Sequence, residues 1–467
     1  MKNTIRKKVL GLGAGLLGAG MLASCSLPSP TAKPGSTTAP TTQQGEAVKG
    51  IKQLSVAPLG LSYKSSYELF NDPLSQLQTS QEKNFAELLK TLRFFSADSF
   101  ELLFAKHKAG KNLLYAPVSL YMDLAMLADA ASAQTAKDLE GTLNPADTLD
   151  REARALAIAE LMRLFNREVT EENAKSQLSN ALWLKEGLGL KSDYRDRLEK
   201  TYHADTYTWG AGSEDQAHEE IGRWVEDKTN KLITADSLPK PLPAPNDALI
   251  LINALYYKSN WQQVFSEGMV EKRDFHYTDG SKAQLDFLVQ KNNFSRSVLR
   301  DDYNVGVFPM TDGAEMRFLL PDESVDPQTL VNKSTFWADL LQNNNDSQDH
   351  DVVWGIPKSD VKGELDLLPL LDEMGLSSLL QNMTLDGGLD GAAANAMALS
   401  AASQSVRIKT HEKGVEAAAV TIMTATTSMP EPKPELDMNL DRPFFCALVN
   451  QYGVPVFVAY IETPGMS

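Results

Sequence analysis

Apolar side chains recur at helical spacing in three segments of the first third of the chain. Residues 81–106 carry two such stripes, one of Phe85, Leu88, Leu89 and Leu92 and a second of Phe100, Leu103 and Phe104. Residues 118–131 and 152–166 repeat the pattern. Apolar stripes of this kind predict helices that each bury one face against a common core.

The later part of the chain is patterned as strands instead. The tail, residues 443–461, predicts two strands around a turn at Gln451-Tyr452-Gly453, and the polar residues 342–350 predict a loop. Helices early and strands late predict an α+β fold. The further runs of strand length lie at residues 181–185, 249–257, 305–308, 316–320 and 407–410.

The N-terminus has the pattern of an export signal. Basic residues precede an apolar stretch at 9–21, which is too short to span a bilayer as a helix. Leu22-Ala23-Ser24-Cys25 then resembles the lipobox of bacterial lipoproteins, and this resemblance implies that residues 1–24 are removed and Cys25 is lipidated. The alternative is an ordinary cleaved signal with an incidental cysteine. Residues 25–48 would be the lipidated cysteine and a Pro/Ser/Thr-rich flexible linker.

Charge and cysteine content exclude some classes of function. The 467 residues carry a formal net charge of −16, and removal of 1–24 would leave 41 basic against 61 acidic residues, or −20. A surface this acidic repels nucleic acid, so no nucleic-acid partner is expected. The only two cysteines are Cys25 and Cys446, so no structural disulfide is expected, and Cys446 lies in an apolar run that predicts a buried thiol.

No catalytic or metal-binding motif is present in the sequence. The six histidines lack metal-ligand spacing, and there is no G-x-S-x-G, P-loop or G-x-G-x-x-G motif. We therefore expect neither a metal nor a cofactor, and no enzyme activity.

An ordered set of short segments resembles the serpin family. Any one fragment is weak, but the same order along residues 98–464 is specific. The segments are 112–120 (NLLYAPVSL), 180–183 (NALW), 224–230 (WVEDKTN), 251–258 (LINALYYK) with Trp261, 319–321 (LLP), 412–419 (EKGVEAAA), 441–444 (DRPF) and 457–464 (FVAYIETP).

The resemblance implies an architecture. It predicts a single large serpin-like domain at residues 98–467, with helices packed on three β-sheets and an exposed reactive loop at about 412–440. Residues 49–97 would be a partly helical N-terminal extension. Four positions fall at the family's shutter and breach sites, where they would control opening of the central sheet: Ser119, Asn253, Trp261 and Gln404.

Some of these positions depart from the family pattern. Ala116 stands where the family has a second shutter serine, and Gln404 where it has a histidine. Because Asn253 is retained, the resemblance suggests a central hydrogen-bond cluster rebuilt with an amide in place of an imidazole.

The resemblance also assigns a hinge at the start of the loop. In this family a protease cleaves the loop, which then inserts into a sheet as a new strand. From Val415 to Ala425, every second residue is small or apolar and none is charged. The inward-facing side of an inserted strand requires this pattern. The hinge residues are Glu412, Gly414, Val415, Glu416, Ala417, Ala418 and Ala419.

The bond offered to the protease follows from the family's spacing. The position about fourteen residues beyond Gly414 places this bond between Ser428 and Met429, with Thr426 and Thr427 as neighbouring candidates. No Lys or Arg lies between Gly414 and Lys433, so an elastase-like or subtilisin-like serine protease is expected rather than a trypsin-like one.

The sequence leaves three functional hypotheses open. The first is a monomeric serpin-type protease inhibitor, lipid-anchored outside the cytoplasm on the bacterial cell envelope or surface. The second is a non-inhibitory serpin that acts as a surface binding protein. The third is an unrelated surface enzyme, which would turn over substrate without forming a covalent complex.

Overall fold

The computed structural model describes residues 50–58, 60–171, 173–238, 240–244, 246–342, 346–415 and 435–465. The expected signal peptide, Cys25 and the linker lie outside these residues, as does the part of the reactive loop from 416 to 434. Within the described ranges, no helix combines the length and apolar content needed to cross a bilayer.

Helices form where the apolar stripes predict them. The α-helices are α1 (Ser66–Asn71), α2 (Glu82–Phe104), α3 (Pro117–Ala130), α4 (Ala133–Leu143), α5 (Arg151–Phe165), α6 (Ser192–Lys200), α7 (Glu214–Lys228), α8 (Pro327–Val331), α9 (Ser334–Leu341), α10 (Leu368–Glu373) and α11 (Ser377–Gln381). Short 3-10 helices lie at Pro73–Ser75, Thr79–Gln81, Ala235–Ser237, Glu267–Met269 and Ala392–Asn395. The helices predicted at 81–106, 118–131 and 152–166 are confirmed as α2, α3 and α5.

The first sheet contains the central strands of the molecule. Its strands are, in spatial order, β1 (Ile51–Ser55), β7 (Ala204–Trp209), β5 (Ala174–Lys185), β8 (Leu249–Asn260), β17 (Gly414–Val415), β16 (Ser403–His411) and β14 (Ser359–Asp366). In addition, β4 (Arg167–Val169) pairs with β5, and β2 (Leu61–Tyr63) pairs with β4.

Two further sheets complete the fold. The second has the order β18 (Glu435–Asn439), β13 (Gln348–Pro357), β10 (Lys282–Leu299), β11 (Tyr303–Pro309), β12 (Glu315–Pro321), β19 (Phe444–Val449), β20 (Pro455–Ile461) and β3 (Leu113–Tyr115), with β9 (Val270–His276) on β10. The third joins β6 (Gly189–Leu190) and β15 (Leu389–Asp390). The predicted α+β class, with one large domain and helices packed on three sheets, is confirmed.

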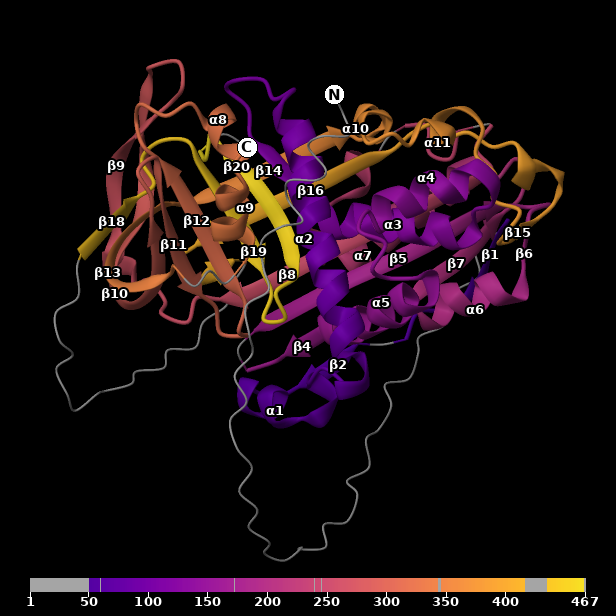
Figure 1. The fold of residues 1–467 in the computed structure, drawn as a ribbon, viewed down its shortest axis with the longest axis horizontal. Coiled ribbons are helices and arrows are strands. Elements are labelled where there is room, and N and C mark those ends of the chain that lie inside the picture. The colour runs from indigo at the N-terminus through magenta and orange to yellow at the C-terminus, as the bar shows by residue number, and fades with distance from the viewer. Residues whose placement is uncertain are drawn as a thin grey trace, which may run out of the picture. The chain divides into compact units, whose positions relative to one another are not determined.

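Both faces of the first sheet are covered. Successive strand residues face opposite sides, and on β5 Leu182 and Leu184 join the main core, whereas Ala181 and Trp183 join a second cluster under α7. Figure 1 shows α3, α5 and α6 lying along this sheet, with α2 running across between the two large sheets. The central strands are therefore buried against apolar side chains on both faces.

The N-terminal part is continuous with the rest of the domain. Residues 50–97 contain β1, β2, α1 and most of α2, and α2 continues without a break past residue 97. β1 pairs antiparallel with β7 and so extends the first sheet by one edge strand. The described residues from 50 to 465 belong to one compact unit.

The loop predicted at residues 342–350 is wrong at its C-terminal end. Residues 348–350 begin β13 and pair with 295–297 of β10. His350 is buried there and bonds to the Ser297 hydroxyl at 2.7 Å. This polar segment forms a strand through backbone pairing with β10, and the buried His350 finds a polar partner across the sheet, which hydrophobic patterning does not register.

Candidate functional site at the gap in the first sheet

The beginning of the loop already occupies the top of a gap between two strands. Gly414 and Val415, which form β17, pair antiparallel with Asn260 and Ser259 of β8. On the other side they pair with β16 at His411 and Thr410. Below this point, no described strand pairs with the second edge of β8 over residues 249–258. The structure therefore contains two facing strand edges joined only at one end.

Val415 is seated in the core. Its side chain is 4 % exposed and packs within the main hydrophobic cluster. Gly414 beside it lies against the backbone of β8, because a Cβ on Gly414 would come within 2.2 Å of the Ser259 carbonyl oxygen and 2.6 Å of the Asn260 Cα. Only glycine allows this approach, so the structure explains the hinge glycine by close packing.

The turn before β17 is held by backbone and indole contacts. The indole Nε1 of Trp261 donates to the His411 carbonyl at 2.9 Å, and its backbone N–H donates to the Lys413 carbonyl at 2.9 Å. Phe265 N–H donates to the Glu412 carbonyl at 2.9 Å. Trp261 is itself fully buried and packs on Phe308 at 4.9 Å between ring centroids. This aromatic cluster fixes where the loop leaves the sheet.

An ion pair adds to the same turn. Lys358 Nζ lies 2.6 Å from Glu412 Oε1. The hydrogen bond from this ammonium holds the pKa of the Glu412 carboxyl below its usual value. The neighbouring His411 has its pKa lowered by burial. The ion pair thus ties the loop base to the end of the connection between β13 and β14.

The two amide side chains predicted as shutter residues, Gln404 and Asn253, lie on opposite sides of the gap. On β16, the Gln404 side chain accepts from Ala116 N–H at 2.8 Å and donates to the Ala116 carbonyl at 3.0 Å. On β8, Asn253 Nδ2 donates to Asn180 Oδ1 at 2.7 Å. Ser119 is buried one turn along α3 from Ala116. Each amide therefore bonds on its own side of the gap.

Comparison with known families decides the identity of this architecture. Residues 90–464 match the family model described as "Serpin (serine protease inhibitor)". The chain belongs to the serpin family. Serpins are mostly inhibitors of proteases and not enzymes. The match spans the gap, the hinge and both large sheets except β1 and β2.

Serpins similar to this chain are known from Arabidopsis thaliana and Homo sapiens. Serpin-Z10 of Arabidopsis thaliana is 25% identical over 372 residues, which cover 76% of this chain and 92% of that one. Neuroserpin of Homo sapiens is 24% identical over 376 residues, which cover 76% and 86%. Among solved structures, the thermophilic serpin Tengpin in the native state superposes with a TM-score of 0.70 at 19% identity, over 87% of this chain and 97% of that one.

A buried polar network that sequence patterns did not predict supports the serpin hinge from below. Asp312 accepts from the Tyr257 hydroxyl at 2.8 Å and from the Ser259 hydroxyl at 2.9 Å, and it pairs with Arg167 at 3.3 Å. Ser259 is the β8 residue that pairs with Val415. Asp312-Gly313 looks like an ordinary turn in sequence, so nothing there signals the network.

Breaking this network should cost stability. We expect Asp312→Asn to lower the free energy of unfolding by about 3–5 kcal/mol, because Arg167 would remain buried with its charge uncompensated. Denaturant unfolding of the full chain measures the change. The exposed Asp301 provides the control, since Asp301→Asn should change stability by less than about 0.5 kcal/mol. Equal effects of the two substitutions would contradict a structural role for Asp312.

The structure brings the predicted hinge residues from Glu412 to Val415 together with Trp261 at the top of the gap. Cys446 is buried in β19 as predicted, and burial raises the pKa of its thiol to about 12. The remaining predicted positions lie outside the described residues: Glu416, Ala417, Ala418, Ala419, Thr426, Thr427, Ser428, Met429 and Cys25.

Proposed function

We propose that this serpin is a suicide-substrate inhibitor of serine proteases, and of cysteine proteases that use the same acyl chemistry. The observation that carries the proposal is the seating of Gly414 and Val415 between β8 and β16. These two residues are the first of a strand whose remaining place is bounded by two strand edges. A loop that continued downward from Val415 would complete the sheet.

The proposed chemistry is an interrupted proteolysis. The protease nucleophile attacks the carbonyl carbon of Ser428, an ester or thioester forms there, and the amine of Met429 leaves with a proton. The loop from 416 onward is then free at its new end and inserts. The attached protease is carried with it before water can hydrolyse the acyl bond.

The registers of β17 support this choice of bond. Because the pairing with β8 is antiparallel, each step down β8 from Ser259 moves one residue further along the loop. Continued in register, residue 425 would lie opposite Leu249, the first residue of β8. The gap can therefore take residues 416–425, so a protease attached at 428 would lie just beyond the far end of the inserted strand.

Specificity follows from the loop sequence. Thr426, Thr427 and Ser428 suit a small substrate pocket, whereas the loop has no basic residue before Lys433. We expect pancreatic elastase or subtilisin to form an adduct that survives denaturing electrophoresis, and trypsin to form none at this loop. Mass spectrometry of the released C-terminal peptide should place its start at Thr427, Ser428 or Met429.

The same experiment separates inhibition from the alternative of a non-inhibitory binding protein. One structural neighbour, human thyroxine-binding globulin, has been solved in complex with thyroxine. A binding protein would be cleaved by elastase or subtilisin without a stable adduct. Cleavage of every molecule with no adduct from any protease tested would overturn the proposal of inhibition.

We further propose that the inhibitor acts at the outer surface of a cell envelope, tethered through Cys25. The lipobox-like Leu22-Ala23-Ser24-Cys25 and the polar linker behind it support this location. Cys25→Ala in the full-length precursor should move the protein from the membrane fraction to soluble fractions or leave it unprocessed. Equal membrane association of the two forms in a detergent-partition assay would argue against the anchor.

A further inference from the structure

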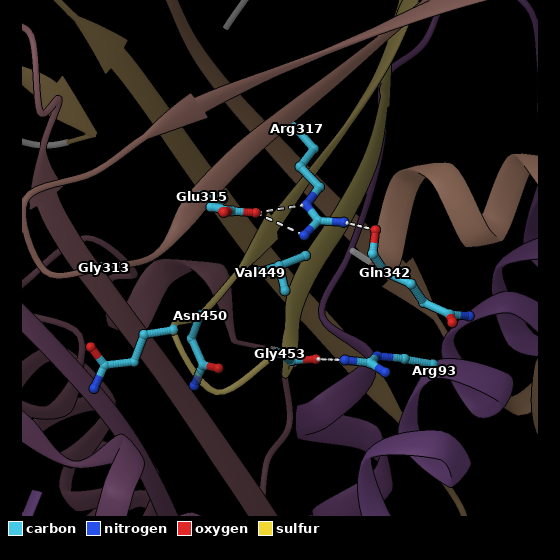
Figure 2. A pocket seen from close by; sticks show the side chains of 9 residues that line it. Arg93, Gly313, Glu315, Arg317, Gln342, Val449, Asn450 and Gly453 are labelled. Atoms are coloured by element: carbon cyan, nitrogen blue, oxygen red, sulfur yellow. Dashed lines mark hydrogen bonds and ion pairs between the residues drawn. The ribbon is translucent and has the colours of Figure 1, made fainter. Parts of the chain in front are cut away.

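A polar pocket lies where α2, β12 and the turn between β19 and β20 meet (Figure 2). Its volume is about 190 Å³. The proposed protease trapping assigns no part to the residues that line it. The lining residues are Arg93, Gly313, Glu315, Arg317, Gln342, Val449, Asn450, Gln451 and Gly453.

Two arginines from separate elements reach this pocket, and they differ in how well they are bonded. Arg317 of β12 is buried and donates through Nε and Nη2 to Glu315 Oε2, at 3.2 and 2.7 Å. Arg93 of α2 donates through Nη2 to the Gly453 carbonyl at 3.2 Å, but its buried Nε has no hydrogen-bond partner. Arg93 therefore brings an unsatisfied donor and an unneutralised charge.

The charge balance of the pocket is positive in a strongly acidic protein. Two guanidinium groups line it against one carboxylate, Glu315, which is already paired with Arg317 and Arg296. Burial, and secondarily the nearby Arg317 charge, lowers the pKa of Arg93. An anion beside Arg93 would relieve both effects, because it would offset the repulsion and accept from Nε.

Glycines keep the space open. A Cβ on Gly453 would come within 2.5 Å of Arg93 Nη2, and one on Gly313 would meet the Gln451 side chain at 2.9 Å. Figure 2 shows the Gln342 backbone carbonyl accepting from Arg317 on the other side of the pocket from Glu315. We propose that this pocket binds a small oxyanion, with Arg93 as the principal contact and Arg317 supplying further positive potential.

Thermal unfolding and isothermal titration of the full chain test the proposal with sodium phosphate, sulfate and acetate, each against chloride at equal ionic strength. Sulfate and phosphate also stabilise proteins by exclusion from their surfaces, so the signal is the difference between wild type and Arg93→Gln. We expect saturable binding in the wild type that Arg93→Gln weakens by about tenfold or more. A response to acetate alone would identify a carboxylate ligand, and a response to phosphate or sulfate a tetrahedral one.

Two further variants make the test decisive. Lys90→Gln removes the same charge from an exposed position of α2 and should leave the binding constant unchanged. Glu315→Gln removes the pocket's negative charge and should tighten binding, the opposite sign to Arg93→Gln. The readout involves no protease, so it is independent of the inhibitory function. Equal anion responses in the wild type, Arg93→Gln and Glu315→Gln would overturn the proposal.

Discussion

Cleavage of the chain between residues 420 and 428 should raise its melting temperature by ~10 °C or more, although a covalent bond is lost. The cut frees the loop to continue the strand that Gly414 and Val415 begin. Each inserted residue then bonds to β8 or β16, at about 1 kcal/mol net per hydrogen bond. The inward-facing apolar side chains add about 25 cal/mol for each Å² removed from water.

The measurement is a thermal unfolding scan of intact and nicked protein, after limited digestion by a protease that leaves no adduct. Cleavage within Lys433-Pro434-Glu435 can be compared with cleavage at 420–428. It would lie close to β18 and leave a much longer free segment attached to β17. A melting temperature that stays the same or falls after a cut at 420–428 would favour the hypothesis that this serpin is a non-inhibitory binding protein.

The sequence predicts those parts of the fold that depend on local pattern. The two stripes between Phe85 and Phe104 are sufficient to place helical structure here, because apolar residues at a period of 3.6 favour a helix, but only the structure shows that both belong to one helix, α2. The 18-residue strand β10 was not predicted, although apolar residues alternate from Ala283 to Val289. Its polar stretch at residues 290–297 has no such alternation. Its stability comes from pairing with β13, which is more than fifty residues away in the sequence.

The candidate site likewise has features that the sequence predicts and features that it does not. The hinge could be located from its motif, and the alternation from Val415 indicated an inward-facing residue. Sequence could not predict that Val415 is already buried in the intact chain, because this depends on the spacing of β8 and β16. Nor could it predict Asp312, whose partners Tyr257, Ser259 and Arg167 come from other strands.

The structure therefore changes what a substitution at the hinge is expected to do. Val415 contacts the core before any protease arrives, so Val415→Arg forces a cation into an occupied apolar site. The arginine can avoid burial only if β17 leaves the sheet. We expect the variant to release β17 in the intact protein and to resist reinsertion after cleavage.

In the proposed mechanism, inhibition is a race between insertion of the loop and hydrolysis of the acyl bond, so Val415→Arg should convert an inhibitor into a substrate. An insertion barrier higher by about 3 kcal/mol shifts that race by over a hundredfold. The candidate bond lies thirteen residues beyond Val415 in the sequence, so the first cleavage should proceed at a near-normal rate. Electrophoresis and the stoichiometry of inhibition measure the outcome as cleaved chain without adduct.

Glu416→Arg is the matched control, because it places the same side chain one residue further along, on the alternate face of an inserted strand. This variant should keep its adduct, and its nicked form should keep the gain in melting temperature. Nicked Val415→Arg should lose that gain. If Val415→Arg still traps protease with unchanged stoichiometry, then residue 415 need not stay in the sheet, and insertion between β8 and β16 is not what holds the protease.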